Sequence, residues 1–139
     1  MTLSTTIIEL DSDPAKNADL EDQLQVLCCE SGLDDTIAFQ FRLAITEAIN
    51  NIIKHSYGEE PGHPIRATWR HGTDAAEIEL RDWAPAPPPP YPPPRGPIPP
   101  PDALSGRGWY IIWEYTDAVR YARMDDGNVL TLTRLRGIR

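Results

Sequence analysis

The longest helical pattern in the chain runs from about Asp34 to Ser56. Its apolar residues recur at spacings of three and four and form one buried stripe: Ile37, Phe41, Ile45, Ala48 and Ile52. A second stripe steps by four along a neighbouring face: Leu43, Glu47, Asn51 and His55. Polar groups beside a core are costly unless they have a partner, which is either another part of the protein or a bound ligand. A purely structural hydrogen-bonded row is therefore the alternative to a ligand site.

Shorter patterns precede this helix. Residues 3–10 carry β-branched and apolar side chains and predict a first strand. The pair Asp13-Pro14 supplies an N-cap and a proline suited to a first helical turn, so we expect a helix there that ends at Ser31-Gly32. Asp34 or Asp35 caps the central helix, and the glycine after Tyr57 stops it.

Two pairs of strands follow. Residues 65–71 and 75–82 alternate and predict a hairpin whose second strand ends at Asp82. Residues 119–124 and 129–135 predict another hairpin, which turns over residues 125–128.

Between these hairpins the composition changes abruptly. From Pro85 to Pro101, 12 of 17 residues are proline, so the segment forms neither a helix nor a central strand. Its length indicates a functional or mobile loop at about residues 84–104. A linker is less suitable because the residues that follow are few for a separate core. A docking strip for a proline-recognising partner is the other alternative.

A glycine turn at residues 104–108 opens a short helix that reaches about Tyr115. Trp109, Ile112 and Trp113 are expected to pack this helix on the sheet. The order of elements predicts an α/β two-layer sandwich, with about three helices covering one face of a mixed sheet. We expect residues 1–139 to form a single domain.

Composition narrows the function classes. A formal charge of −8 with no basic stripe argues against direct nucleic-acid binding. The start of the chain has no signal peptide, and no apolar run is long enough to cross a membrane. Adjacent Cys28 and Cys29 are expected to be reduced, and the cytoplasm is the expected compartment.

Candidate chemistry is carried by four features in chain order. Glu47 and Asn51 lie one turn apart on a helix, Asp82 ends a strand, and Gly106-x-Gly108 opens a helix after the long loop. A carboxylate can orient a hydroxyl, and an amide oxygen can hold hydrated magnesium. A strand-end aspartate can accept from an exocyclic amine, and a glycine-opened helix favours phosphate. Lysine patterns of ordinary phosphate loops are absent.

These motifs resemble the GHKL (Bergerat-type) ATP-binding domain, and within it the anti-sigma-factor serine kinases of bacterial partner-switching systems. The resemblance covers nearly the whole chain. Residues 41–55 are similar to the family's N box, Asp82 stands where its adenine-contacting aspartate belongs, and residues 106–112 resemble its second glycine box.

The resemblance implies a role for each matching residue. Glu47 corresponds to the general base that prepares the acceptor serine, and Asn51 to the magnesium ligand. Asp82 corresponds to the residue that reads adenine. The implied phosphate loop comprises Ser105, Gly106, Arg107 and Gly108. The proline tract takes the place of the ATP lid, and His55 has no firm role.

The implied function is an ATP- and Mg²⁺-dependent protein serine/threonine kinase that sequesters a sigma factor and phosphorylates a small anti-sigma antagonist; family members commonly form homodimers. Two departures favour an alternative, a nucleotide-binding anti-sigma module without kinase turnover. The family's D-x-G becomes Asp82-Trp83-Ala84, whose methyl group crowds the base, and the lid is stiffened by proline. An isolated histidine-kinase-like ATPase domain is a third reading, disfavoured because no phospho-acceptor helical domain precedes it.

Overall fold

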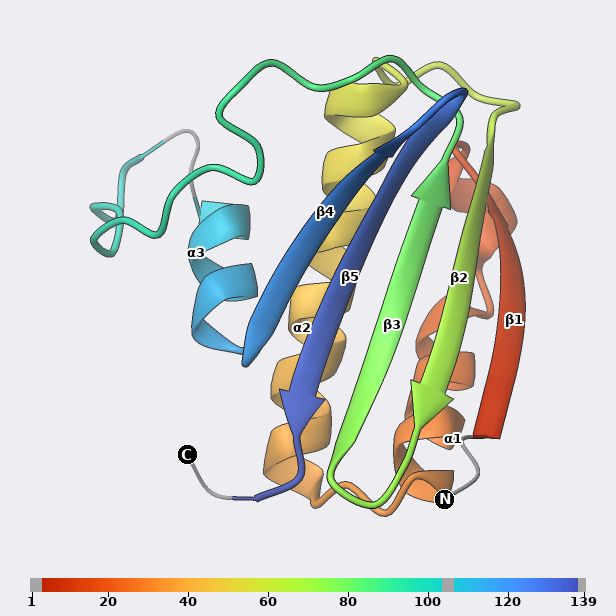
Figure 1. Ribbon diagram of the computed structural model, residues 1–139, viewed down its shortest axis with the longest axis vertical. Helices are drawn as coiled ribbons and strands as arrows, with labels where there is room; N and C mark the ends of the chain where they lie inside the picture. Colours follow the sequence, from red (N-terminus) through yellow and green to blue (C-terminus); the bar gives the residue numbers. More distant parts are fainter. Residues whose placement is uncertain (1–3, 104–106, 138–139) are drawn as a thin grey trace.

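One five-stranded sheet with helices on one face organises the molecule (Figure 1). The computed structural model describes residues 4–103 and 107–137. Its strands are β1 (Ser4–Asp11), β2 (Pro64–His71), β3 (Ala75–Asp82), β4 (Ala118–Met124) and β5 (Gly127–Leu135). Its α-helices are α1 (Leu20–Glu30), α2 (Asp35–Asn51) and α3 (Arg107–Glu114). The predicted α/β two-layer sandwich is confirmed.

The sheet is antiparallel throughout, in the order β1-β2-β3-β5-β4, so the expectation of a mixed sheet is wrong. The reason lies in the connection after β3. Helix α3 returns the chain to the opposite edge of the sheet, so β4 runs in the direction of β3 (Figure 1). The hairpin partner β5 then inserts between them and pairs antiparallel with both.

The first helix is divided. Asp13 caps a short 3₁₀ helix, Pro14–Asn17, by accepting from the Ala15 N–H at 3.1 Å, and α1 begins only at Leu20. The cap and the proline therefore start one turn rather than the whole predicted helix. Leu24, Leu27 and Cys28 form the buried face of α1, as the apolar spacing predicts.

Helix α2 supplies the centre of the core. Asp34 caps it by accepting from the Ile37 N–H at 2.9 Å, and the whole predicted apolar stripe is buried. Phe41 packs on Trp69 of β2 with ring centroids 5.7 Å apart.

Among residues 4–103 and 107–137, no helix is both long and apolar enough to traverse a bilayer.

The last turn of the predicted central helix is a π-helix, Ile52–Ser56. It closes with a hydrogen bond of 3.0 Å from Tyr57 N to Ile52 O, one residue wider than an α-turn. A spacing of four no longer places two residues on one face there. His55 is accordingly exposed, whereas Glu47 and Asn51 are half-buried.

The proline-rich residues 85–103, here termed the proline strap, form the predicted irregular segment, which runs from the end of β3 toward α3 (Figure 1). Pro93 O accepts a hydrogen bond of 2.9 Å from Trp113 Nε1. Only Ile112 of α3 is fully buried among the described residues. Trp109 packs partly buried against the core, whereas Trp113 is not among the residues packed there and bonds Pro93 instead, so the expectation that both tryptophans pack α3 on the sheet is only partly right.

The hairpin β4–β5 turns more tightly than expected. Met124 already pairs with Gly127, so residues 125 and 126 make the whole turn and Asn128 belongs to a strand. Gly127 also lies against β3: a Cβ there would stand 2.0 Å from Asp82 O and 2.8 Å from Trp83 Cα. The close approach of the two strand ends requires glycine.

We expect Gly127→Ala to destabilise the fold, because the added methyl forces backbone of β3 and β5 apart. Overpacking of this kind typically costs about 1–3 kcal/mol of unfolding free energy. Gly96→Ala is the matched control, since nothing lies within 4 Å of the Cβ position at Gly96. Denaturant unfolding of the two variants measures the difference, and equal stabilities would contradict the close approach.

Candidate functional site

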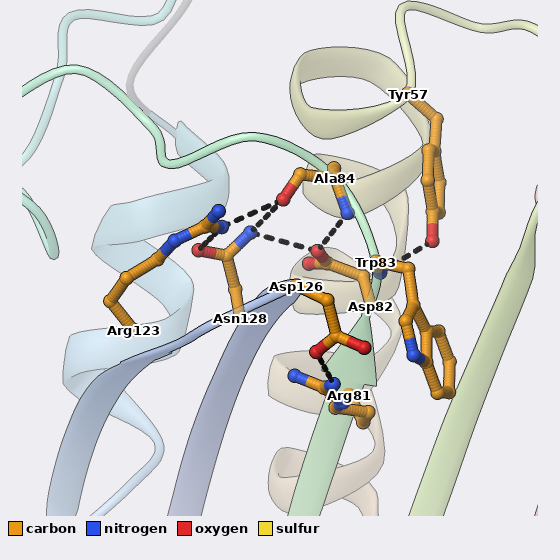
Figure 2. A network of polar contacts seen from close by, with 8 residues as sticks. All are labelled: Tyr57, Arg81, Asp82, Trp83, Ala84, Arg123, Asp126 and Asn128. Carbon is orange, nitrogen blue, oxygen red and sulfur yellow. Dashed lines mark hydrogen bonds and ion pairs between the residues drawn. The ribbon is translucent and has the colours of Figure 1, made fainter.

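Asp82 lies at the end of β3 and is buried, with 3% of its surface exposed. One carboxylate oxygen, Oδ1, accepts from Asn128 Nδ2 at 2.8 Å and from the Ala84 N–H at 3.0 Å (Figure 2). Within the described residues no hydrogen bond reaches Oδ2. The fold therefore engages one carboxylate oxygen of Asp82 through two hydrogen bonds.

Burial is the main influence on this carboxyl group. Desolvation raises the pKa of Asp82 above the ordinary value, while the Ala84 N–H and the Asn128 amide oppose it. The positive charges of Arg81 and Arg123 oppose it less strongly. Burial thus penalises the charged form of Asp82, and a few fixed donors offset part of that penalty.

Asn128 holds Asp82 in place and was missed by sequence reasoning, which put it in a turn. Its Oδ1 accepts from the Tyr121 hydroxyl and from Arg123 at 3.3 Å. Its Nδ2 donates to Asp82 and, at 3.2 Å, to the carbonyl oxygen of Ala84 (Figure 2). Because donors face its oxygen and acceptors face its nitrogen, the Asn128 side-chain amide can take only one orientation. The local sequence Asp125-Asp126-Gly127-Asn128 is typical of a turn and gave no signal for this role, because the partner Asp82 is 46 residues away.

The alanine that replaces the family's glycine fits the backbone here. Ala84 is buried and is not among the described residues with positive φ, so its conformation does not require glycine. Its neighbour Trp83 donates its N–H to the Tyr57 hydroxyl at 2.8 Å, and that hydroxyl donates to Pro64 O at 2.7 Å. Two hydrogen bonds therefore hold the backbone after Asp82: the Trp83 N–H bonds Tyr57, and the Ala84 N–H bonds Asp82.

Glu47, Asn51 and Gly108 meet where α2 passes the start of α3. A Cβ on Gly108 would lie 3.0 Å from Glu47 Oε2 and 3.6 Å from Asn51 Oδ1. Asn51 Nδ2 is buried and makes no hydrogen bond with any described residue. A side chain at residue 108 would crowd the Glu47 carboxylate, and the Asn51 amide nitrogen beside it has no hydrogen-bond partner among the described residues.

The other predicted site residues are dispersed or undescribed. Ser105 and Gly106 lie outside the described residues. Arg107 begins α3, and its guanidinium donates to Pro100 O at 2.9 Å. His55 is exposed on the π-turn, away from the row it was expected to continue.

A magnesium ion fits these residues only together with phosphate. Within residues 4–103 and 107–137, no group of three or more His, Cys, Asp or Glu side chains could hold a metal. Asn51 and Glu47 offer two oxygen-bearing side chains beside Gly108. Magnesium is commonly bound in this way, by one or two protein oxygens plus phosphates and water.

The structure thus combines an antiparallel α/β sandwich, a buried aspartate at a strand end and a carboxylate–amide pair beside Gly108 of α3. The model of the histidine kinase-like ATPase domain family matches residues 10–134. The chain belongs to that family, which is a family of ATP-binding domains. A search of curated proteins gives no match to this chain.

We expect the pKa shift of Asp82 to appear as a pH-dependent stability difference between the wild type and Asp82→Asn. The folded-state pKa is raised from 3.8, so the folded protein holds this proton more tightly than the unfolded chain does. Relative to the variant, the wild type should lose stability as pH rises from 3.8 through the raised pKa, and then level off.

Asp126→Asn is the control, because the pKa of Asp126 is shifted in the opposite direction to that of Asp82. The hydrogen bond from Arg81 lowers the pKa of Asp126, so this group contributes stability at higher pH that is lost as pH falls. Unfolding free energies across the acid range provide the comparison. Parallel curves for the wild type and Asp82→Asn would contradict the effect of burial on Asp82.

Proposed function

We propose that this protein is an anti-sigma factor and an ATP-dependent protein serine kinase of a bacterial partner-switching system. It would sequester a sigma factor and phosphorylate a small anti-sigma antagonist on serine or threonine. The family assignment supports ATP use, and the similarity of residues 41–55 and 106–112 to the N box and second glycine box supports this more specific function.

The observation that carries the proposal is the meeting of Glu47 and Asn51 with Gly108. It places a carboxylate and an unpartnered amide against the start of a helix, where the helix dipole favours phosphate. Asp82 lies at the end of the strand with one oxygen left for a ligand. A base at Asp82 and phosphates near Gly108 would thus be recognised by different elements of one domain.

In this proposal, named atoms of the chain accept the serine proton, contact adenine and hold the metal. Glu47 accepts the proton of the attacking serine hydroxyl, and Asp82 Oδ2 accepts from the exocyclic amine of adenine. Asn51 would hold magnesium. When bound, magnesium neutralises charge on the phosphate oxygens.

A specific observation favours a second candidate, a nucleotide-binding anti-sigma module without kinase turnover. The proline strap is tied to α3 through Trp113 and Arg107, so the segment that replaces a lid is already engaged. Proline also lacks the N–H groups with which a lid would contact phosphate. Kinase assays separate the two candidates.

We expect Glu47→Gln to nearly abolish phosphorylation of an anti-sigma antagonist. The carboxamide is nearly isosteric but cannot accept the serine proton, and general-base catalysis is typically worth about 10²–10⁴-fold in rate. Nucleotide and sigma-factor binding should survive, because Asp82 and Asn51 remain. A phosphorylation time course and a sigma-factor pull-down measure both effects.

Glu30→Gln, an exposed carboxylate at the end of α1, is the matched control and should phosphorylate normally. Wild-type rates in Glu47→Gln would remove the general-base role from Glu47. No phosphorylation by the wild type, with ATP binding intact, would instead support the module without turnover.

We expect Asp82→Asn to weaken ATP binding and leave the fold intact. The substituted amide can still accept from Asn128, but if its NH₂ takes the place of Oδ2 it opposes the donor amine of adenine. The lost hydrogen bond and mismatch should cost about 1–3 kcal/mol of binding free energy. Calorimetric titration with ATP measures this, with the exposed Asp126→Asn as control. Equal affinities in the two variants would exclude Asp82 from adenine recognition.

A further inference from the structure

Tyr91 is the one described tyrosine of the proline strap, and it is directed inward. Its ring packs edge-on against Tyr121 of β4, with centroids 4.8 Å apart and an interplanar angle of 80°. It packs in the same way against Trp109 of α3, at 5.5 Å and 88°. Edge-to-face pairs are favourable arrangements for aromatic rings, so Tyr91 is held from two sides.

Its two aromatic neighbours belong to the two halves of the candidate site. Tyr121 donates its hydroxyl to Asn128, the residue that holds Asp82. Trp109 directly follows Gly108, which lies against Glu47. Tyr91 therefore packs on one residue that bonds the partner of Asp82 and on another that adjoins Gly108.

The electrostatics agree with this position. Burial, with a smaller contribution from the negative charge of Asp82, raises the pKa of Tyr91 to about 12. The phenol is thus close enough to Asp82 to feel its charge, while most of its own solvation has been removed. Tyr91 is part of the candidate site, although it lies in a segment that sequence reasoning treats as a lid or linker.

Four hydrogen bonds join the strap to α3. Trp113 Nε1 donates to Pro93 O at 2.9 Å, and Arg107 donates to Pro100 O at 2.9 Å. Arg95 bonds the Trp113 carbonyl oxygen at 3.2 Å and the Glu114 carboxylate at 2.9 Å. On α3, the residues that make these bonds flank Trp109, the helix residue on which Tyr91 packs. The bonds therefore help to keep the Tyr91 ring in place.

We propose that the proline strap is an autoinhibitory segment: Tyr91 fills the space between Asp82 and Gly108 that a nucleotide needs, and binding requires the strap to release it. The inference rests on the nucleotide site of the proposed function. The apparent affinity of such a protein falls in proportion to the fraction of molecules that are open. A strap that is closed in about 90–99% of molecules would weaken nucleotide binding about 10- to 100-fold.

The test compares four proteins by calorimetric titration with ATP and magnesium: wild type, Tyr91→Ala, Tyr91→Phe and Trp113→Phe. We expect Tyr91→Ala to bind about 10- to 100-fold more tightly than the wild type, because the open fraction rises. Tyr91→Phe keeps the ring and should bind like the wild type. Trp113→Phe removes the bond to Pro93 while leaving Tyr91 unchanged, so it should shift affinity in the same direction as Tyr91→Ala but by less.

A second measurement needs no nucleotide. Arg95 is exposed and followed by glycine, so tryptic cleavage after it reports release of the strap. We expect faster cleavage in Tyr91→Ala and Trp113→Phe than in Tyr91→Phe. In the wild type, ATP should accelerate this cleavage, whereas a lid that closes over ATP would be protected by it.

The outcomes separate this inference from the function on which it rests. Equal or weaker ATP binding by Tyr91→Ala, with ATP bound by the wild type, overturns autoinhibition and leaves the nucleotide site in place. Protection of Arg95 by ATP overturns it as well. Absence of ATP binding in all four proteins, even where cleavage shows a released strap, overturns the nucleotide site and the inference together.

Discussion

The site depends on the burial of one carboxylate. Removing Asp82 from water raises the free energy of its charged form, and only a few fixed donors offset that cost. Those donors come from the next turn of chain and from the neighbouring strand β5. Because Asn128 must reach Asp82, the ends of β3 and β5 have to meet, and Gly127 removes the side chain that would prevent it.

The same constraint extends outward from the sheet. Asn128 is itself oriented by Tyr121 and Arg123 of β4, so the edge strand contributes to the site without providing a ligand. Arg123 also bonds the Ala84 carbonyl oxygen at 2.8 Å, where the proline strap begins. Arg123, which helps to orient Asn128 and through it Asp82, therefore also fixes the point at which the strap leaves β3.

Periodicity was sufficient to predict the layers. The apolar stripe of α2, both hairpins and the α/β sandwich follow from spacings of three, four and two, because burial of one face is a local property of each element. The pairing of β5 with β3 did not follow, since it depends on which strand of a hairpin inserts beside β3. His55 was placed wrongly because a π-turn, which has no marked sequence signature, changes the residue spacing.

The resemblance named Glu47, Asn51, Asp82 and Gly108 as candidate site residues, and the structure adds that Glu47 and Asn51 lie beside Gly108. Asn128 and Tyr91 were missed for different reasons. Asn128 acts through a partner 46 residues away in the chain, which no local pattern reveals. Tyr91 stands among prolines, where composition indicates an irregular segment and says nothing about the surface on which it packs.

The proline content of the strap has a consequence for the entropy of its two states. An ordinary segment gives up about 1–2 kcal/mol per residue of backbone freedom when it is ordered. Proline has surrendered much of that freedom beforehand, in every state of the chain, because its ring fixes φ. A strap with 12 prolines between residues 85 and 101 can therefore be immobilised by a handful of contacts, and it gains little disorder when they break. Its two positions differ mainly in enthalpy and solvation, so a modest change in either suffices to move it.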